Sequence, residues 1–246
     1  MKLGAKEGWN IPADRPFYPE LPATYRNVKI HNVFFKTDPE AVARFVPNPF
    51  EPDPEGLCSA IGLDIPFCTA YGPFLEAAIQ YKCSFRGEQG WFSGYVFHDG
   101  PAGIAAGREI YGTAKIFSGL DIKQYQRMMT TEACMAGEPV MSVQTVMNEP
   151  CEPEDIPKTA PSWRLKIIPR ADGPGPAIKQ IINGSKAAQN VTVHASFKGT
   201  GAVRFDANGW YDMTPLKPLE YLDAYYTESS FQETYAEIVY DFLAEG

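Results

Sequence analysis

Apolar and polar residues alternate at 78–85 and at 140–147, with the period of two that is typical of half-buried β-strands, and the chain from residue 57 onward is rich in strand-like segments. The segment 78–85 (Ala-Ile-Gln-Tyr-Lys-Cys-Ser-Phe) shows this alternation well, and a turn-forming Arg-Gly-Glu-Gln-Gly follows it at 86–90. The pattern predicts strands at 32–36, 57–65, 76–85, 91–97, 102–111, 140–147, 163–168, 190–198 and 201–206, and leaves 121–137 open between helix and strand. The chain is therefore expected to be rich in β-structure.

Two segments carry helix signals instead. Asp38 followed by Pro39 is an N-cap with proline at the first helical position, and predicts a short helix that Pro47 ends. Near the C-terminus, residues 230–233 (Ser-Phe-Gln-Glu) read as a capping box. An apolar stripe follows the box and predicts a final helix, with members Phe231, Tyr235, Ile238, Val239, Phe242 and Leu243.

The first 29 residues differ in composition from the rest. They place four prolines among aromatic residues, which predicts an extended N-terminal arm that packs either on a neighbouring subunit or on its own core. Residues 30–246 contain no internal repeat, no low-complexity tract and no clear boundary, so they are expected to form a single mainly β domain with few helices.

Composition narrows the classes of partner. The 246 residues are 44% hydrophobic and 21% charged with a formal net charge of −8, which suits a soluble globular protein and argues against nucleic acid as a partner. No apolar run approaches the roughly 20 residues that span a bilayer, and the N-terminus lacks the apolar core of a signal peptide. Five irregularly spaced cysteines fit reduced thiols, so we expect a cytoplasmic protein without a membrane partner.

The segment 107–117 (Gly-Arg-Glu-Ile-Tyr-Gly-Thr-Ala-Lys-Ile-Phe) holds Lys115 among small and apolar neighbours. A free lysine has a pKa of about 10.4, and burial disfavours the ammonium form and so frees the amine. Such an amine condenses with ketones to form a Schiff base whose iminium withdraws electrons from an adjacent bond. The alternative is a lysine that buries only its stem and keeps its charge in solvent.

This segment resembles the active-site segment of the acetoacetate decarboxylase family, in which Gly-Arg-Glu is followed after five residues by the Schiff-base lysine. The spacing from Gly107 to Lys115 agrees with that pattern. Further islands of resemblance, in the same order, lie at 37–38 (Thr-Asp), 46–47 (Val-Pro), 165–169 (Leu-Lys-Ile-Ile-Pro), 172–173 (Asp-Gly), 191–194 (Val-Thr-Val-His) and 239–243 (Val-Tyr-Asp-Phe-Leu). The chain is similar to this family from about residue 30 to residue 243.

The resemblance implies a closed antiparallel β-barrel-like core with a few peripheral helices, a homo-oligomer, and a small keto acid as substrate. It implies Lys115 as the nucleophile and Glu76 as the active-site glutamate, which orients the amine or carries a proton. Arg108 and Glu109 match the family's Arg-Glu pair, and they either line the pocket or form a structural ion pair that shapes it. Without these roles, Glu76 would be an exposed residue at the start of a strand.

Two departures from the family pattern bear on the chemistry. Ile116 stands where the best-known decarboxylases carry a second lysine, so burial would have to activate the amine without help from a neighbouring ammonium. The family's charged pair near the first strand falls at Val28 and Ile61 here. Arg26 and Asp64 lie nearby as replacements, but a register shift decides whether they reach the pocket. Without them the cavity would be more apolar and its substrate different from acetoacetate.

Tyr71 and Tyr111 are candidates for contact with the substrate, as are Phe74 and Phe117, although such aromatic residues also serve as core. The three histidines have no metal-ligand spacing, so no metal site is expected. No glycine-rich phosphate loop is present, and no cofactor is expected because the lysine iminium would itself accept the electrons.

Three functions remain open on the sequence. The first is a Schiff-base lyase that decarboxylates a β-keto acid. The second keeps the lysine but performs aldolase–dehydratase or retro-aldol chemistry on pyruvate or a related keto acid, which some relatives of the decarboxylases perform. The third is a non-catalytic barrel that binds an apolar ligand, and the presence of both Lys115 and Glu76 argues against it.

Overall fold

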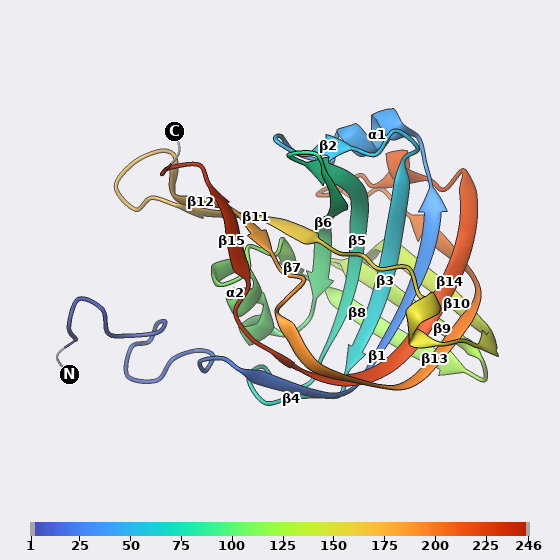
Figure 1. Cartoon of the computed structure of the whole chain (residues 1–246), viewed down its shortest axis with the longest axis horizontal. Coiled ribbons are helices and arrows are strands. Elements are labelled where there is room, and N and C mark those ends of the chain that lie inside the picture. The colour runs from blue at the N-terminus through green and yellow to red at the C-terminus, as the bar shows by residue number, and fades with distance from the viewer. Residues whose placement is uncertain (1–2, 245–246) are drawn as a thin grey trace.

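The protein, seen in a computed structural model that describes residues 3–244, consists mainly of β-strands (Figure 1). The strands are β1 (Ala23–Lys36), β2 (Glu51–Pro52), β3 (Leu57–Ile65), β4 (Phe67–Cys68), β5 (Phe74–Phe85), β6 (Glu88–His98), β7 (Lys115–Phe117), β8 (Gly119–Tyr125), β9 (Met128–Met135), β10 (Glu138–Pro150), β11 (Ser162–Pro169), β12 (Pro176–Asn183), β13 (Ala188–Phe205), β14 (Glu220–Glu233) and β15 (Glu237–Asp241). The helices are α1 (Pro39–Ala43) and α2 (Pro101–Glu109), with the 3-10 turns η1 (Pro153–Asp155) and η2 (Thr214–Leu216). The expected mainly β fold with few helices is confirmed.

All strands belong to one sheet, whose order is β15-β12-β11-β6-β5-β3-β1-β14-β13-β10-β9-β8, with β2, β4 and β7 paired to β5, β1 and β6. Neighbours are antiparallel, except that β7 and β11 run parallel to β6. The end strands β15 and β8 do not pair with each other among the described residues, so hydrogen bonds do not close the strongly curved sheet. The expected closed barrel is in this respect an open one. Instead, β8 and β9 fold back and approach β5.

The central strands present different side chains to their two faces, because successive residues of a strand point to opposite sides. On β5, Ala77, Ile79 and Tyr81 enter the main hydrophobic core, whereas Glu76 and Ala78 face a cavity on the other side. The same alternation holds along β1 and β3, so one face of the sheet is filled by apolar packing and the other borders open space.

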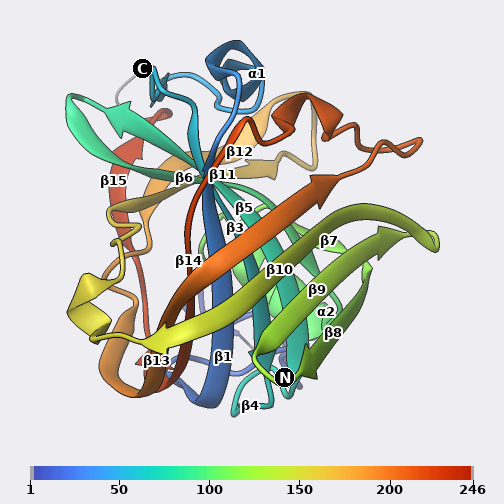
Figure 2. The same cartoon turned by 90° about the vertical axis from the view of Figure 1, so that its right-hand side faces the viewer.

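The filled face packs against the second half of the chain. Figure 2 shows β10, β9 and β8 lying across β1, β3 and β5. The fully buried side chains of Val33, Phe35 and Ile79 meet those of Met141 and Val143 in one cluster. Complete burial of an apolar side chain of this size contributes about 1.5–3 kcal/mol, so each of these residues contributes appreciably to stability.

A polar triad crosses this core. His31 on β1 is fully buried, and its Nδ1 and Nε2 lie 3.1 Å and 2.6 Å from the hydroxyls of Thr145 and Thr131. Gly62 on β3 leaves room for the ring, since a Cβ there would lie 2.3 Å from Nε2 of His31. Burial lowers the pKa of His31 to about 4, so the ring is neutral at physiological pH.

We predict that this histidine makes stability depend on pH. Histidine in the unfolded chain has a pKa near 6.5, so below that pH the unfolded state binds a proton at His31 whereas the folded state does not. The free energy of unfolding should therefore fall as pH drops from about 6.5 to about 4, by about 3 kcal/mol from this residue. Urea unfolding at several pH values should show a shallower decline for His31→Gln, whereas His194→Gln, at an exposed position, should keep the wild-type slope. Equal slopes in all three proteins would contradict the prediction.

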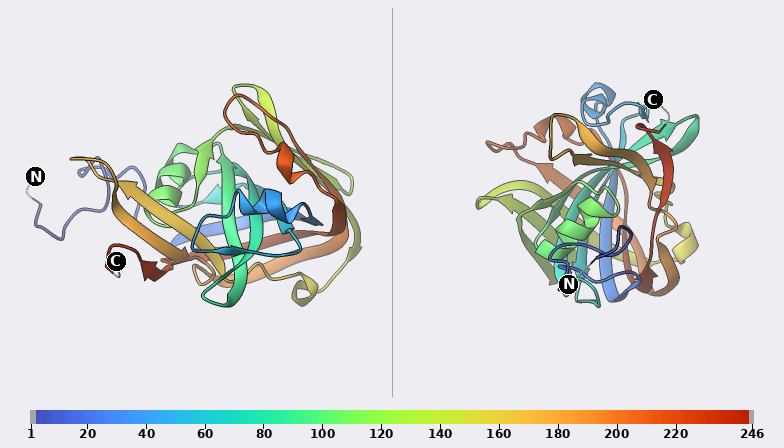
Figure 3. Two further views of the ribbon diagram at one scale, coloured as in Figure 1. Left: turned by 90° about the horizontal axis from the view of Figure 1, so that it is seen from above. Right: turned by 90° about the vertical axis from the view of Figure 1, so that its left-hand side faces the viewer.

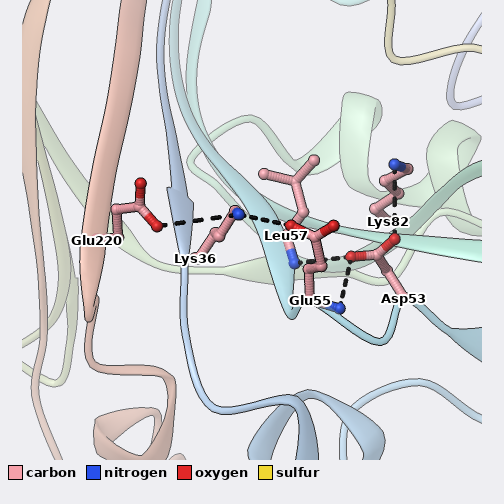
Figure 4. Close-up of polar contacts among 6 residues, drawn as sticks. All are labelled: Lys36, Asp53, Glu55, Leu57, Lys82 and Glu220. Carbon is pink, nitrogen blue, oxygen red and sulfur yellow. Dashed lines mark hydrogen bonds and ion pairs between the residues drawn. The ribbon is translucent and has the colours of Figure 1, made fainter.

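A set of ion pairs ties the strand ends together near α1 (Figure 4). Nζ of Lys36 lies 2.5 Å from Glu55 and 3.9 Å from Glu220, which links β1 to the turn before β3 and to β14. Asp53 in the same turn pairs with Lys82 of β5 at 3.5 Å and accepts a hydrogen bond from the amide of Glu55. These contacts fix the end of β5 opposite to Glu76.

The N-terminal arm, which precedes β1, packs against other parts of the same chain. Trp9 packs edge-on against Tyr18 and Tyr235, and the hydroxyl of Tyr18 donates a hydrogen bond to Glu109 at the end of α2. Figure 3 shows the arm, in dark blue, beside α2. Because β1 begins at Ala23, the arm is shorter than predicted, and the expected boundary after residue 29 falls inside this strand.

The short helix after Asp38 is confirmed, since α1 begins at Pro39 and the Asp38 carboxylate accepts a hydrogen bond from the amide of Glu40. The helix predicted at the C-terminus is wrong. Residues 220–233 form β14, which pairs with both β1 and β13, and residues 237–241 form β15. Pairing on both edges outweighs the local capping-box pattern, because helix propensity is weak compared with tertiary contacts.

The strand predicted at 102–111 is also wrong, because α2 occupies this segment. Pro101 stands at the first helical position, and alanine-rich residues follow, both of which favour a helix. The ambiguous segment 121–137 forms a hairpin of β8 and β9, and the two strands predicted at 190–206 are one continuous strand, β13.

Candidate active site

The open face of the central strands borders a cavity of about 360 Å³. Its walls come from alternate side chains of β1, β3, β5 and β14, from α2, from residues 156–159, and from Arg164 of β11. Most of the lining is apolar, including Val28, Ile30, Ile61, Leu63, Ile65, Phe74, Val96 and Phe231. A cavity of this size with a few convergent polar groups is typical of a small-molecule site.

Lys115 begins β7 and lies opposite Val96 of β6. Its Nζ is 3.0 Å from Oε2 of Glu76 on β5 and 5.3 Å from the centre of the Phe74 ring. Only 14% of the lysine side chain and 16% of the glutamate side chain are exposed. The structure thus brings the predicted nucleophile and the predicted glutamate into contact inside a largely apolar cavity.

Two opposing effects act on Glu76. Burial would raise the pKa of its carboxyl, but the positive charge of Lys115 and its hydrogen bond, with a smaller contribution from Arg164, lower it more. The net pKa of Glu76 lies below its ordinary value, so the side chain is a carboxylate at neutral pH. An ionised group at this position can accept a proton from the amine.

His98 of β6 is the cross-strand neighbour of Glu76. Its Nδ1 accepts a hydrogen bond from the amide of Gly100, which leaves the proton of the neutral ring on Nε2, 4.0 Å from the Glu76 carboxylate. Burial and the charge of Lys115 lower the pKa of His98 to about 3 despite the opposing effect of Glu76. The ring stacks on Phe74 at 4.3 Å, so it is a neutral, rigid neighbour of the carboxylate.

Two glycines of α2 let the helix approach the site closely. A Cβ at Gly107 would lie 2.6 Å from Cδ and 2.8 Å from Cε of Lys115, and a Cβ at Gly103 would lie 2.7 Å from the His98 ring. These residues are four apart and therefore share one face of the helix. The glycine of the Gly-Arg-Glu sequence thus has a physical role, which is to leave room for the lysine stem.

We predict that Gly107→Ala displaces the amine of Lys115 from Glu76. Alanine favours a helix more than glycine does, so α2 should remain folded while the rate of Schiff-base formation falls roughly 100-fold, the scale expected for a displacement of about 1 Å. Borohydride trapping over time measures this rate. The control is Gly173→Ala, where an added Cβ meets no atom within 4 Å. A Gly107→Ala protein that traps ketones at the wild-type rate would refute the prediction.

A second charged pair that the sequence analysis did not select lines the cavity. Arg164 of β11 and Glu233 of β14 are both partly buried, and Arg164 helps to lower the pKa of Glu76. Glu233 accepts a hydrogen bond of 2.8 Å from the hydroxyl of Tyr25. Burial raises the pKa of Glu233, although the Tyr25 bond and the nearby cations oppose this effect.

The predicted Arg-Glu pair lies outside the cavity, which corrects the expectation that it lines the pocket. Arg108 is exposed and donates a hydrogen bond to the backbone carbonyl of Lys115 at 3.2 Å. Glu109 instead accepts a hydrogen bond from the hydroxyl of Tyr18. The two side chains form no ion pair with each other within residues 3–244. Through its hydrogen bond to Lys115, Arg108 instead links α2 to the start of β7.

The replacements considered for the family's charged pair do not reach the cavity either. Arg26 is exposed and stacks on Phe67 at 5.4 Å, and Asp64 pairs with Lys29 at 3.5 Å. Val28 and Ile61 do line the cavity and make this part of it apolar.

Of the aromatic candidates, Tyr71, Phe74 and Tyr111 line the cavity, whereas Phe117 is 65% exposed. The hydroxyl of Tyr111 donates to the carbonyl of Thr234, and that of Tyr71 is buried with no hydrogen-bond partner among the described residues. Tyr71 therefore has a polar atom that a ligand could engage.

Within the described part of the chain, no group of three or more His, Cys, Asp or Glu side chains is arranged to hold a metal ion. All five cysteines, which lie in this part, carry free thiols. Nor does any described helix have the length and apolar character needed to cross a membrane.

Comparison with known proteins identifies the relatives of the chain. A family model described as acetoacetate decarboxylase (ADC) matches residues 10–243. Acetoacetate decarboxylase 1 of Bradyrhizobium diazoefficiens is 23% identical over 245 residues, which cover 98% of this chain and 96% of that protein.

Two solved structures share the fold. Acetoacetate decarboxylase from Legionella pneumophila matches with a TM-score of 0.85 at 20% identity, over 99% of this chain and 100% of that one. The enduracididine biosynthesis enzyme MppR, complexed with pyruvate, matches with a TM-score of 0.79 at 15% identity, over 97% of this chain and 100% of that one. Since the family model spans nearly the whole sequence, the chain belongs to the acetoacetate decarboxylase family.

Proposed function

We propose that this protein is a lyase that forms a Schiff base between Lys115 and the carbonyl carbon of a small keto acid. The observation that carries the proposal is the contact of the Lys115 amine with the Glu76 carboxylate, at 3.0 Å, inside a mostly apolar cavity. Glu76 takes up the proton that leaves the amine during attack and returns it to the carbinolamine oxygen, which departs as water.

The first candidate reaction is decarboxylation of a β-keto acid, the reaction named in the family. The electron pair of the bond to the carboxylate moves into the iminium, carbon dioxide leaves, and an enamine remains. Protonation of the enamine carbon and addition of water then release the ketone and free Lys115. The iminium itself accepts the electrons, so the proposed reaction uses no organic cofactor or metal.

A second candidate keeps the same Schiff base but makes or breaks a bond between carbons that both stay in organic products, as in aldolase–dehydratase chemistry on pyruvate. The apolar residues Val28 and Ile61 favour it, because they stand where the resemblance places the charged end of a decarboxylase site. The fold shared with MppR, which is known in complex with pyruvate, agrees with this candidate.

Borohydride reduction with acetoacetate and with pyruvate, followed by intact-mass and peptide analysis, tests both candidates. Trapping of acetoacetate at Lys115 with release of carbon dioxide supports decarboxylation. Trapping of pyruvate at Lys115, without carbon dioxide from acetoacetate, supports aldol chemistry. If neither compound adds mass at Lys115, the Schiff-base proposal fails and a ligand-binding role gains weight.

A further inference from the structure

Arg164 brings a positive charge into the cavity without a direct partner. Lys115 and Arg164 belong to β7 and β11, the two strands that pair with the edge of β6 not occupied by β5. Nε of Arg164 is buried and has no hydrogen-bond acceptor, and the guanidinium lies 5.7 Å from the centre of the Tyr111 ring. No carboxylate among residues 3–244 forms an ion pair with this guanidinium, although Glu233 and Glu76 are near enough to influence its pKa.

A guanidinium remains charged in a protein, and a buried charge is unfavourable unless a partner satisfies it. Burial lowers the pKa of Arg164, and the more distant Glu233 and Glu76 only partly offset that effect. The ligand that suits this group is a carboxylate, because its two oxygens match the paired N–H groups of the guanidinium fork.

The guanidinium is also positioned by a close backbone contact. A Cβ at Gly184, directly after β12, would lie 1.9 Å from Nη1 of Arg164 and 2.6 Å from its Cζ. The absence of a side chain at this position therefore lets the guanidinium lie close to the backbone at the cavity wall, and any larger residue would push it away.

We propose that Arg164 binds the carboxylate of an α-keto acid whose keto carbon is bonded to Lys115, and that this carboxylate is retained in the product. The inference rests on the proposed Schiff base. A cation that stabilises a carboxylate opposes its loss as carbon dioxide, because the attraction is greater in the ground state than in the transition state. Arg164 therefore favours the second candidate reaction over decarboxylation of the bound carboxylate.

The reaction then balances without an oxidant or reductant. The α-keto acid and the amine form an iminium and water, and loss of a proton from the neighbouring carbon gives an enamine. The enamine carbon attacks the carbonyl carbon of an aldehyde, whose oxygen takes a proton. Addition of water to the iminium releases a hydroxylated α-keto acid and restores Lys115, while the carboxylate stays on Arg164.

Pyruvate and its neutral analogue pyruvamide test the proposal, since they differ only in the charge of the group that Arg164 would bind. In wild type, half-maximal borohydride trapping at Lys115 should need a lower concentration of pyruvate than of pyruvamide. Arg164→Met should raise the concentration of pyruvate needed for half-maximal trapping about 10- to 100-fold. The same substitution should change the concentration of pyruvamide needed by less than about twofold. Arg164→Lys should restore part of the preference, and Arg170→Met, which removes an exposed arginine paired with Asp172, should change neither value.

Trapping of pyruvamide reports that each variant is folded with a reactive Lys115. If Arg164→Met does not fold, Gly184→Ala gives the same test. This substitution displaces the guanidinium, so it should weaken the trapping of pyruvate more than the trapping of pyruvamide. Equal losses for both compounds, or no preference for pyruvate in wild type, would overturn the role of Arg164 and leave the Schiff base intact. If wild type traps neither these compounds nor acetoacetate, the proposed function itself fails, and this inference with it.

Discussion

Lys115→Met is expected to abolish covalent trapping of acetoacetate and pyruvate and to lower turnover roughly 10⁴-fold or more, the scale seen when a catalytic nucleophile is removed. Methionine keeps an unbranched side chain of similar length, so it can fill the space beside Gly107 and Phe74 without an amine. The fold should be retained, because the main hydrophobic core lies on the other face of the sheet. Intact mass after borohydride reduction and assay of carbon dioxide release measure the two effects.

The matched control is Lys166→Met. Lys166 is also partly buried and donates to the carbonyl of Ile110 at 3.4 Å, but it borders a separate pocket beneath the N-terminal arm. This variant should gain mass at Lys115 as the wild type does. An adduct that persists in Lys115→Met at another lysine, located by peptide mapping, would show that the nucleophile has been misassigned.

The contact between Lys115 and Glu76 illustrates what the sequence could predict. The local pattern gave only a lysine among apolar residues, and no local rule links it to a glutamate on a different strand. The resemblance supplied the pairing, and the structure places the two atoms 3.0 Å apart. The strand containing Glu76 was predicted well because its alternation is regular over many residues.

The position of Arg26 could not be predicted, because it depends on a β-bulge. The pairing of β1 with β14 shifts register between Tyr25 and Val28, and Asn27 there has a φ of 52°, in the left-handed region. The bulge lets both Tyr25 and Val28 line the cavity and turns Arg26 outward. A single inserted residue reverses which side chains face inward, and nothing in the local sequence specifies it.

Glu233 and Arg164 were missed for different reasons. Glu233 fitted a capping box, and a residue assigned to the first turn of a helix is not sought in a cavity, although the structure places it at the end of β14. Arg164 follows the buried Trp163 in a strand that was predicted at 163–168. A charged residue at the alternate position of such a strand is usually solvent-exposed, and only the arrangement of β11 beside β6 brings it to the cavity.

The α2 helix also explains a feature of the site that composition could not reveal, which is the close approach of Gly103 and Gly107 to buried side chains. Gly103 and Gly107 lie one turn apart and share one face of this helix. In a helix they face His98 and Lys115 together, so the two glycines set how closely the helix approaches the reacting amine.

Glu76→Gln should slow Schiff-base formation at pH 7 by roughly 10² to 10⁴-fold, the usual contribution of a positioned general base. Glutamine keeps the size of the side chain and one hydrogen-bond acceptor near Lys115, but it accepts no proton. The rate of trapping in a time course with excess cyanoborohydride measures the effect. Glu109→Gln, which removes a carboxylate outside the cavity, should trap at the wild-type rate.

The pH dependence separates this role from a merely structural one. Because the charge of Lys115 outweighs burial and holds the pKa of Glu76 below its ordinary value, the group becomes ionised at a pH lower than about 4.5 and stays ionised above it. A base must be ionised to act, so the wild-type rate should show no rise due to Glu76 between pH 5 and pH 8, and Glu76→Gln should lower the rate at every pH in this range. Circular dichroism at each pH confirms that both proteins are folded. A variant that traps within threefold of wild type at pH 7, or that regains the wild-type rate at higher pH, would exclude Glu76 as the base and leave the proton to another group in the cavity.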